Sequence, residues 1–245
     1  MYFRTEGVVL KKRNFGEADR ILTLFTRDYG KVVAIGKGVR RPRSKKAGHL
    51  ELGNWCKVFI ARGKSLDIIT EVELKRAFGI DEFREEKANK IYHLLELVDA
   101  LTAEHQKNPQ VFILLVQYLK KCSDEDDFNL VSSVFKIKLM SQLGFFSASA
   151  FKNSKTKRVL GFLENEEFEK IKEKINPPQD SLGPQSRLPA RVLATKGVYR
   201  GTRTASSTYS KNSRGYLKLL TFLDSMIENI TQSKLRTSKF LDGTI

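Results

Sequence analysis

Positive charge is concentrated on one short stretch of this sequence. Six of the ten residues from Lys37 to Lys46 are Lys or Arg, and none is acidic. Ammonium and guanidinium groups at this density neutralise phosphates and release the counterions condensed around a nucleic-acid strand. Three more cations end a nearby apolar run. The nucleic-acid contacts predicted for this part of the chain are Lys11, Lys12, Arg13, Lys37, Arg40, Arg41, Arg43, Lys45 and Lys46.

Aromatic side chains near these cations are candidates for stacking on exposed bases. Phe15, Tyr29, Trp55 and Phe59 lie in the same part of the sequence. Base stacking beside a basic groove is a common way to hold single strands without sequence preference. For Trp55 and Phe59 we favour the alternative, a place in the core of the predicted barrel.

A second basic part lies toward the end of the sequence. The net charge is +16, and residues 176–245 carry 11 Lys or Arg against 4 Asp or Glu. The segment 176–215 is rich in Pro, Ser and Gln and poor in apolar residues, so we predict an irregular loop or arm. Its cations are further predicted nucleic-acid contacts: Arg200, Arg203, Lys211 and Arg214.

Groups for bond-making chemistry are not clustered in the sequence. His49, His93 and His105 are scattered, and no GxSxG or GxxxxGK[ST] motif is present. The acidic run Asp124–Asp127 fits a helix start better than a metal site. Two cysteines, Cys56 and Cys122, are too few for a four-cysteine zinc site. We therefore predict a protein that is not an enzyme and that needs neither a metal nor a cofactor.

The first 79 residues have the pattern of a small all-β domain. Short β-branched runs alternate with turn residues, and five strands are predicted within 6–15, 19–30, 30–38, 56–63 and 65–74. In the last run we expect Leu66, Ile68, Val72 and Leu74 on one face, with Ile69 as the exception. Five strands in this length favour a closed barrel of the OB type.

From residue 80 onward the apolar period becomes helical, which predicts an α-helical domain over 80–245. Stripes at helical spacing begin after Asp81, after the cap and first residue Asn108–Pro109, and after the acidic run at 124–127. Further helices are expected at 165–175 and 215–230. The predicted fold class is α+β: an N-terminal five-stranded OB-fold barrel followed by an α-helical domain.

No leader or membrane segment is expected. The apolar run near the N-terminus stops after four residues, and no apolar stretch reaches 18 residues. We expect no membrane partner and a cytoplasmic, nucleoid-associated location.

Residues 6–48, "EGVVLKKRNFGEADRILTLFTRDYGKVVAIGKGVRRPRSKKAG", resemble the opening of the bacterial RecO family of recombination mediators. Three further pieces are similar to the same family: "FKIKLMSQLGF" at 135–145, "LKLLTFL" at 217–223 and "LRTSKFLDGTI" at 235–245. The likeness is weak between about 147 and 215, where many relatives carry a four-cysteine zinc module and this chain has no cysteine.

The resemblance implies binding of single- and double-stranded DNA and annealing of complementary strands. It also implies cooperation with RecR, and action on DNA coated with single-stranded DNA-binding protein so that a RecA-type recombinase can load. In the family, the helical domain binds the acidic, phenylalanine-ended tail of the coating protein. Lys136 stands at a position that is usually basic in the family, so it is the predicted partner of the tail's terminal carboxylate.

The predicted function is thus a DNA-binding recombination mediator in DNA repair. An OB-fold RNA-binding factor in translation or ribosome assembly is the main alternative. A nuclease would need clustered Asp, Glu or His beside the basic surface, and a structural adaptor would use the charge only for solubility.

Overall fold

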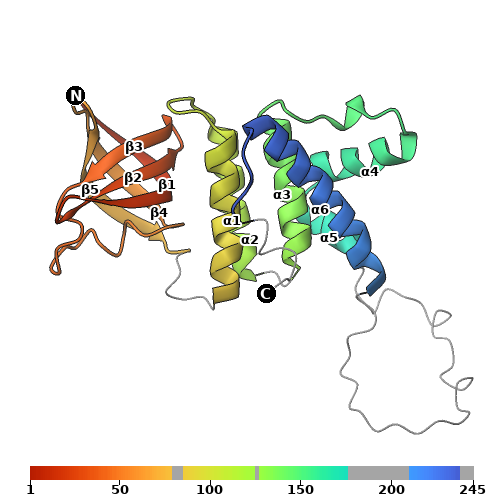
Figure 1. Cartoon of the computed structure of the whole chain (residues 1–245), viewed down its shortest axis with the longest axis horizontal. Coiled ribbons are helices and arrows are strands. Elements are labelled where there is room, and N and C mark those ends of the chain that lie inside the picture. Colours follow the sequence, from red (N-terminus) through yellow and green to blue (C-terminus); the bar gives the residue numbers. More distant parts are fainter. Residues whose placement is uncertain (79–84, 125–126, 176–209, 238–245) are drawn as a thin grey trace, which may run out of the picture.

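The computed structural model has an all-β part followed by helices (Figure 1) and describes residues 1–78, 85–124, 127–175 and 210–237. The strands are β1 (Tyr2–Phe15), β2 (Asp19–Thr26), β3 (Gly30–Gly36), β4 (Trp55–Ala61) and β5 (Asp67–Arg76). The helices are α1 (Glu85–Leu101), α2 (Pro109–Asp124), α3 (Phe128–Gln142), a 3-10 turn at Ala148–Ala150, α4 (Ser154–Asn165), α5 (Phe168–Ile175) and α6 (Ser210–Thr231).

The five strands close into a barrel. Neighbouring strands follow the order β1-β2-β3-β5-β4, and β4 pairs back onto β1. All pairs are antiparallel except β3 and β5, which pair in parallel at Ala34 and Asp67. This is the connectivity of the OB fold, and closure removes the open sheet edges. The predicted fold class, a five-stranded OB-fold barrel followed by helices, is confirmed.

A bulge in β5 corrects the predicted face of that strand. Ile60 of β4 pairs with Ile69, whereas the next residue Phe59 pairs with Glu71, so Thr70 is the extra residue. Its hydroxyl donates a hydrogen bond to the Phe59 carbonyl at 3.0 Å. A bulge changes which residues face inward. Ile69 is therefore fully buried in the barrel core, where Ile68 was expected, while Val72 and Leu74 still pack on that core.

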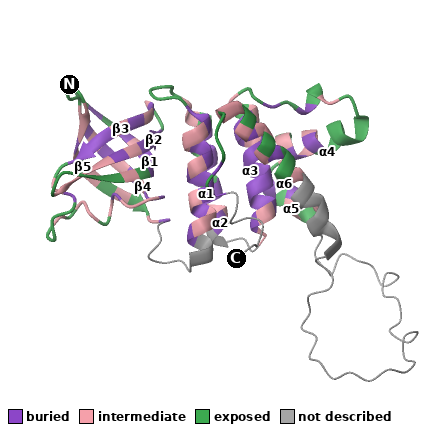
Figure 2. Ribbon diagram, viewed as in Figure 1, coloured by how far each residue is buried: buried purple, intermediate pink, exposed green. Residues whose placement is uncertain are grey.

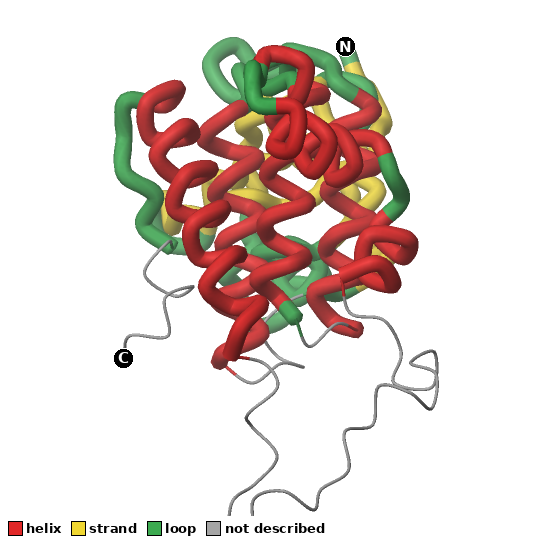
Figure 3. The backbone as a smooth tube through the Cα atoms, turned by 90° about the vertical axis from the view of Figure 1, so that its right-hand side faces the viewer, coloured by secondary structure: helices red, strands yellow, loops and turns green. Residues whose placement is uncertain are grey.

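The helices α1, α2 and α3 form the centre of the second part. Caps define two of their starts: the Val111 amide donates to Asn108 Oδ1 at 3.2 Å, and the Leu130 amide donates to Asp127 Oδ1 at 3.1 Å. Asp127, the last residue of the acidic run, thus caps α3, and a helix start at this run was predicted. Helix α3 is buried around almost its whole circumference by α1, α2, α4 and α6 (Figure 2). Figure 3 looks onto these helices with the barrel behind them.

Barrel and helices share one hydrophobic core, because Val8, Leu10 and Phe25 of the barrel pack with residues of α1 and α2. At the contact, Gly30 has φ +67°, and a Cβ there would lie 2.1 Å from the carbonyl oxygen of Gln106. Only glycine fits this approach. The adjacent Lys31 Nζ donates to the Asp99 carbonyl at 2.7 Å and holds β3 against the end of α1.

Two helical segments differ from the sequence prediction. Helix α4 was not predicted, although Asn153 caps it by accepting hydrogen bonds from the amides of residues 155 and 156. Helix α6 begins at Ser210, five residues before the expected start. The greater part of the predicted irregular segment, 176–209, lies outside the described residues. Among the described helices, none is long and apolar enough to cross a bilayer.

Candidate nucleic-acid interface

The basic stretch after β3 folds as a series of turns anchored at both ends, here called the basic loop (residues 37–50). Val39 and Leu50 are fully buried in the barrel core. Between them, successive turns are closed by backbone hydrogen bonds, for example from the Ser44 amide to the Arg41 carbonyl at 2.9 Å. Gly38 supplies the left-handed backbone conformation, with φ +66°, that starts the first turn. The loop's cations are therefore held on a fixed backbone.

The basic loop is also tied to the turn between β1 and β2. The Gly38 amide donates to Asp19 Oδ1 at 2.7 Å, and the Arg40 amide donates to the Ala18 carbonyl at 2.9 Å. The Arg40 guanidinium donates to the Gly16 carbonyl at 3.0 Å. These three bonds bring residues 13–19 and 37–40 into one surface.

Six predicted cations lie exposed on this surface: Arg13, Lys37, Arg40, Arg41, Arg43 and Lys45. Apart from Arg40, their side chains form no hydrogen bond or ion pair with the described part of the chain. Phe15, at the end of β1, is 48% exposed beside them. Free cations next to an exposed ring are the two elements that a single-strand surface needs. We name the set of these six cations and Phe15 the loop surface.

Three other predicted cations are already engaged. Lys11 forms an ion pair with Asp99 of α1, and Lys12 forms one with Glu51. Lys46 Nζ donates to the Ile69 carbonyl at 3.3 Å. The sequence could not assign the two ion pairs, because the partners in each pair lie 39 or more residues apart in the chain.

Glu51 joins two cations at the edge of the loop surface. Its carboxylate accepts from Lys12 and, at 2.9 Å, from Arg20 Nη1. Partial burial acts to raise the pKa of this carboxyl, but the hydrogen bonds and charges of Lys12 and Arg20 outweigh burial and lower it. Glu51 therefore stays ionised and neutralises charge that would otherwise face a phosphate.

The other aromatic candidates have different surroundings. Tyr29 packs on Phe3 with ring centroids 4.3 Å apart, at the end of the barrel core. Trp55 packs on the helical core and lies under Lys120, whose Nζ is 5.6 Å from the ring centroid. Phe59 points outward and stacks on Tyr2. The expectation of a barrel-core position is thus wrong for Phe59, and Trp55 is packed by helices rather than by the barrel interior.

Lys136 is fully buried in α3, and its Nζ lies 2.5 Å from Asp224 Oδ1 of α6. Its charge is neutralised inside the protein, so in this structure it joins two helices and presents no cation at the surface. Tail binding by Lys136 stays a prediction, and its burial counts against it.

The second predicted basic group is only partly described. Arg200 and Arg203 lie outside the described residues. Lys211 and Arg214 fall in the first turns of α6, where the backbone is described but their side chains are not. Their role as nucleic-acid contacts stays a prediction.

Side chains that could hold a metal ion are not gathered at the loop surface in the described part of the chain. No group of three or more His, Cys, Asp or Glu side chains is placed there, or elsewhere in the described chain, to hold a metal ion. Burial raises the pKa of the Cys56 thiol and of the Cys122 thiol to about 12, so neither is a thiolate nucleophile at neutral pH.

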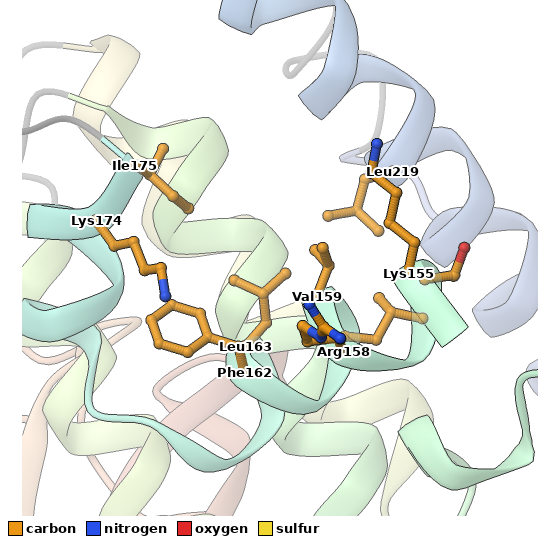
Figure 4. Close-up of a pocket in the computed structure, with 10 residues that line it drawn as sticks. Lys155, Arg158, Val159, Phe162, Leu163, Lys174, Ile175 and Leu219 are labelled. Carbon is orange, nitrogen blue, oxygen red and sulfur yellow. The ribbon is translucent and has the colours of Figure 1, made fainter. Parts of the chain in front are cut away.

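A pocket that the sequence did not predict opens between α4, α5 and α6 (Figure 4). Its volume is about 760 Å³, and apolar side chains such as Phe162, Leu163 and Leu219 line it. Three cations stand around it: Lys155, Arg158 and Lys174. The Lys174 ammonium lies 4.7 Å from the centre of the Phe162 ring. An apolar pocket with a cationic rim suits an acidic ligand with a hydrophobic end.

The fold and the loop surface define a class: an OB-fold barrel with a helical partner domain and a basic, open face. The family model described as "Recombination protein O N terminal" matches residues 1–78, and "Recombination protein O C terminal" matches residues 91–150. The chain belongs to the RecO family.

Curated relatives agree with this assignment. The DNA repair protein RecO of Symbiobacterium thermophilum is 36% identical over 146 residues, which cover 58% of this chain and 57% of that protein. The DNA repair protein RecO of Desulfitobacterium hafniense is 32% identical over 143 residues, covering 58% and 52%. That of Halalkalibacterium halodurans is 27% identical over 146 residues, covering 59% and 57%. The matched segment thus spans about half the length of these relatives.

Proposed function

We propose that this protein is a DNA-binding recombination mediator in DNA repair, which binds single- and double-stranded DNA through the loop surface and anneals complementary strands. The observation that carries the proposal is the loop surface itself, a group of exposed cations that form no ion pair with the described residues and lie beside the exposed ring of Phe15. Membership of a family whose curated members are named DNA repair proteins supports the choice of DNA as the ligand.

The physical basis for annealing is charge neutralisation. Two DNA strands repel each other through their phosphates, and a basic surface lowers that repulsion while it leaves the base edges free to pair. Phosphate contacts carry no sequence information, so any pair of complementary strands is a substrate. No step of this function needs a metal, a nucleotide or a covalent intermediate.

The proposed partners follow from the family. They are RecR, the single-stranded DNA-binding protein that coats the substrate, and, indirectly, a RecA-type recombinase that loads afterwards. For the acidic, phenylalanine-ended tail of the coating protein, the pocket between α4, α5 and α6 suits the ligand better than Lys136. It offers apolar lining for the phenyl ring and Lys155, Arg158 and Lys174 for the carboxylates.

Annealing tests the proposal directly. Complementary oligonucleotides coated with single-stranded DNA-binding protein are mixed with and without this protein, and duplex formation is followed by fluorescence transfer. We expect faster annealing with the protein, and less acceleration as salt rises. An unchanged rate, with no binding to naked oligonucleotides in dilute buffer, would contradict the proposal. Stronger competition by RNA than by DNA of the same sequence would favour the RNA-binding alternative.

A further inference from the structure

Two aromatic rings stack on the outer surface of the barrel, far along β1 from the loop surface. The rings of Tyr2 and Phe59 are nearly parallel, at 10°, with centroids 5.8 Å apart. The strand neighbours Phe3 and Ile60 are buried, so in an alternating strand Tyr2 and Phe59 face outward. The N-terminal end of β1 lies on the side of the barrel away from the helices (Figure 1).

This pair leaves aromatic surface open to solvent. Tyr2 is 64% exposed, whereas Phe59 is half-buried. A ring in this position adds nothing to the hydrophobic core of the barrel. Exposed aromatic surface of this kind is typical of a contact site. A parallel, offset stack that is open on one side can be extended by another flat π-system.

Charge around the pair is arranged asymmetrically. Arg4 pairs with Phe59 across β1 and β4, and Arg62 follows Ala61, the partner of Tyr2. Both arginines are exposed, but the Arg62 guanidinium lies 5.3 Å from the centre of the ring of the buried Phe3, so only Arg4 shares the outer face with Phe59. On the other side, exposed Glu71 of β5 pairs with Phe59. A phosphate beside the pair is thus attracted toward Arg4 and repelled by Glu71 on the β5 side.

We propose that Tyr2 and Phe59 form a stacking site for an unpaired nucleobase, with Arg4 beside it for a flanking phosphate. Bases within a duplex stack on each other and present only their edges, so this site selects single strands. The loop surface, at the other end of the 14-residue strand β1, binds phosphates of either form of DNA. The barrel thereby recognises phosphate charge at one site, the loop surface, and unpaired bases at another, the Tyr2–Phe59 stack.

The inference rests on the proposed DNA binding, and one set of ligands distinguishes the two. Affinities of the full chain are measured for a labelled oligo-dT, an abasic oligonucleotide of equal length and a duplex. For Tyr2→Ala we expect about tenfold weaker binding of oligo-dT, within the range for losing one stacked base. Binding of the abasic strand and of the duplex stays within twofold of wild type. The conservative variant Tyr2→Phe keeps the ring and retains wild-type affinity for all three.

Several outcomes would overturn the inference. Unchanged oligo-dT affinity in Tyr2→Ala, with DNA still bound, refutes the stacking site and leaves the proposed function intact. An equal loss for all three ligands means that the ring acts through the fold and not on a base, which also refutes it. If wild-type protein binds none of the ligands, both proposals fail. A thermal melt of each variant checks that it is folded.

The variant Glu71→Gln provides a second test. Removing the negative charge beside the stacking site should strengthen oligo-dT binding about twofold.

Discussion

The Nζ atom of Lys136 in α3 lies 2.5 Å from Oδ1 of Asp224 in α6, and the lysine side chain is completely buried. Helix α6 follows α5 only after 34 intervening residues, 176–209, so this ion pair joins segments far apart in the sequence. A charge removed from water is tolerated in a protein interior only when an opposite charge or several hydrogen bonds compensate it. The pair therefore fixes where α6 lies against α3.

Removing the carboxylate leaves the lysine as a buried charge without its counterion. We expect Asp224→Asn to lower the free energy of unfolding by about 3 kcal/mol, in the range for breaking a buried pair. Lys136→Met should cost less, because Asp224 keeps 18% of its side-chain area exposed to water. Urea denaturation followed by circular dichroism measures both. Glu228→Gln on the same helix is the control, with an expected change below about 0.5 kcal/mol.

His93 predicts a pH dependence of stability. Burial lowers the pKa of His93 well below 6.5, and the charge of Lys136 lowers it further. Its Nδ1 lies 2.7 Å from the Thr237 hydroxyl, which donates to Glu96, so Nδ1–H is the donor. The lowered pKa keeps the imidazole neutral. The unfolded chain takes up a proton below pH 6.5 that the folded protein does not. Stability is therefore full above this pH and is lost as the pH falls below it.

The expected loss between pH 6.5 and 5.5 is about 1 kcal/mol, because the histidine of the unfolded chain is already half protonated at pH 6.5. Denaturation at pH 6.5 and 5.5 measures it in wild type and in His93→Gln, whose amide can still donate to Thr237. The variant should lack this part of the pH dependence. Identical pH slopes in the two proteins would show that His93 is protonated in the folded state or irrelevant to acid stability.

The pocket between α4, α5 and α6 predicts where a partner's acidic tail binds. Replacing Arg158 and Lys174 together with Ala should weaken binding of an acidic peptide that ends in phenylalanine by about tenfold, or about 1.4 kcal/mol. Lys170→Ala, also on α5 but paired with Glu166 outside the pocket lining, is the matched control. Fluorescence anisotropy of a labelled peptide gives the affinities. If instead Lys136→Met weakens binding and the pocket variant does not, the tail binds where the sequence suggested.

The sequence was sufficient for features set by local patterns. Alternating apolar residues and turn residues predicted all five strands. The cap Asn108 and the acidic run that ends at Asp127 predicted two helix starts. It failed where distant parts meet. The burial of Lys136 as an ion pair depends on Asp224, which is 88 residues away. One signal of burial was present in the sequence, because Lys136 lies between Phe135 and Ile137 in a helix that is apolar on every side.

Other features needed coordinates for the same reason. The bulge at Thr70 is defined by pairing with β4, which a strand's own alternation does not contain. The stack of Tyr2 on Phe59 joins residues 57 positions apart. Helix α4 was missed because its exposed first turns carry few apolar residues, and only Leu160 and Leu163 are buried. The pocket combines three helices and has no signature in any one of them.

The central claim is that the loop surface binds DNA through its phosphates, and the salt dependence of binding measures this most directly. Arg41, Arg43 and Lys45 are replaced together with Ala, while Arg40 is kept because it bonds to Gly16. Each lost phosphate contact should reduce the slope of log affinity against log salt by about 0.7 on a single strand. We predict a slope smaller by about 2, with equal weakening on two oligonucleotides of unrelated sequence. An unchanged slope, or a loss confined to one base sequence, would contradict the account.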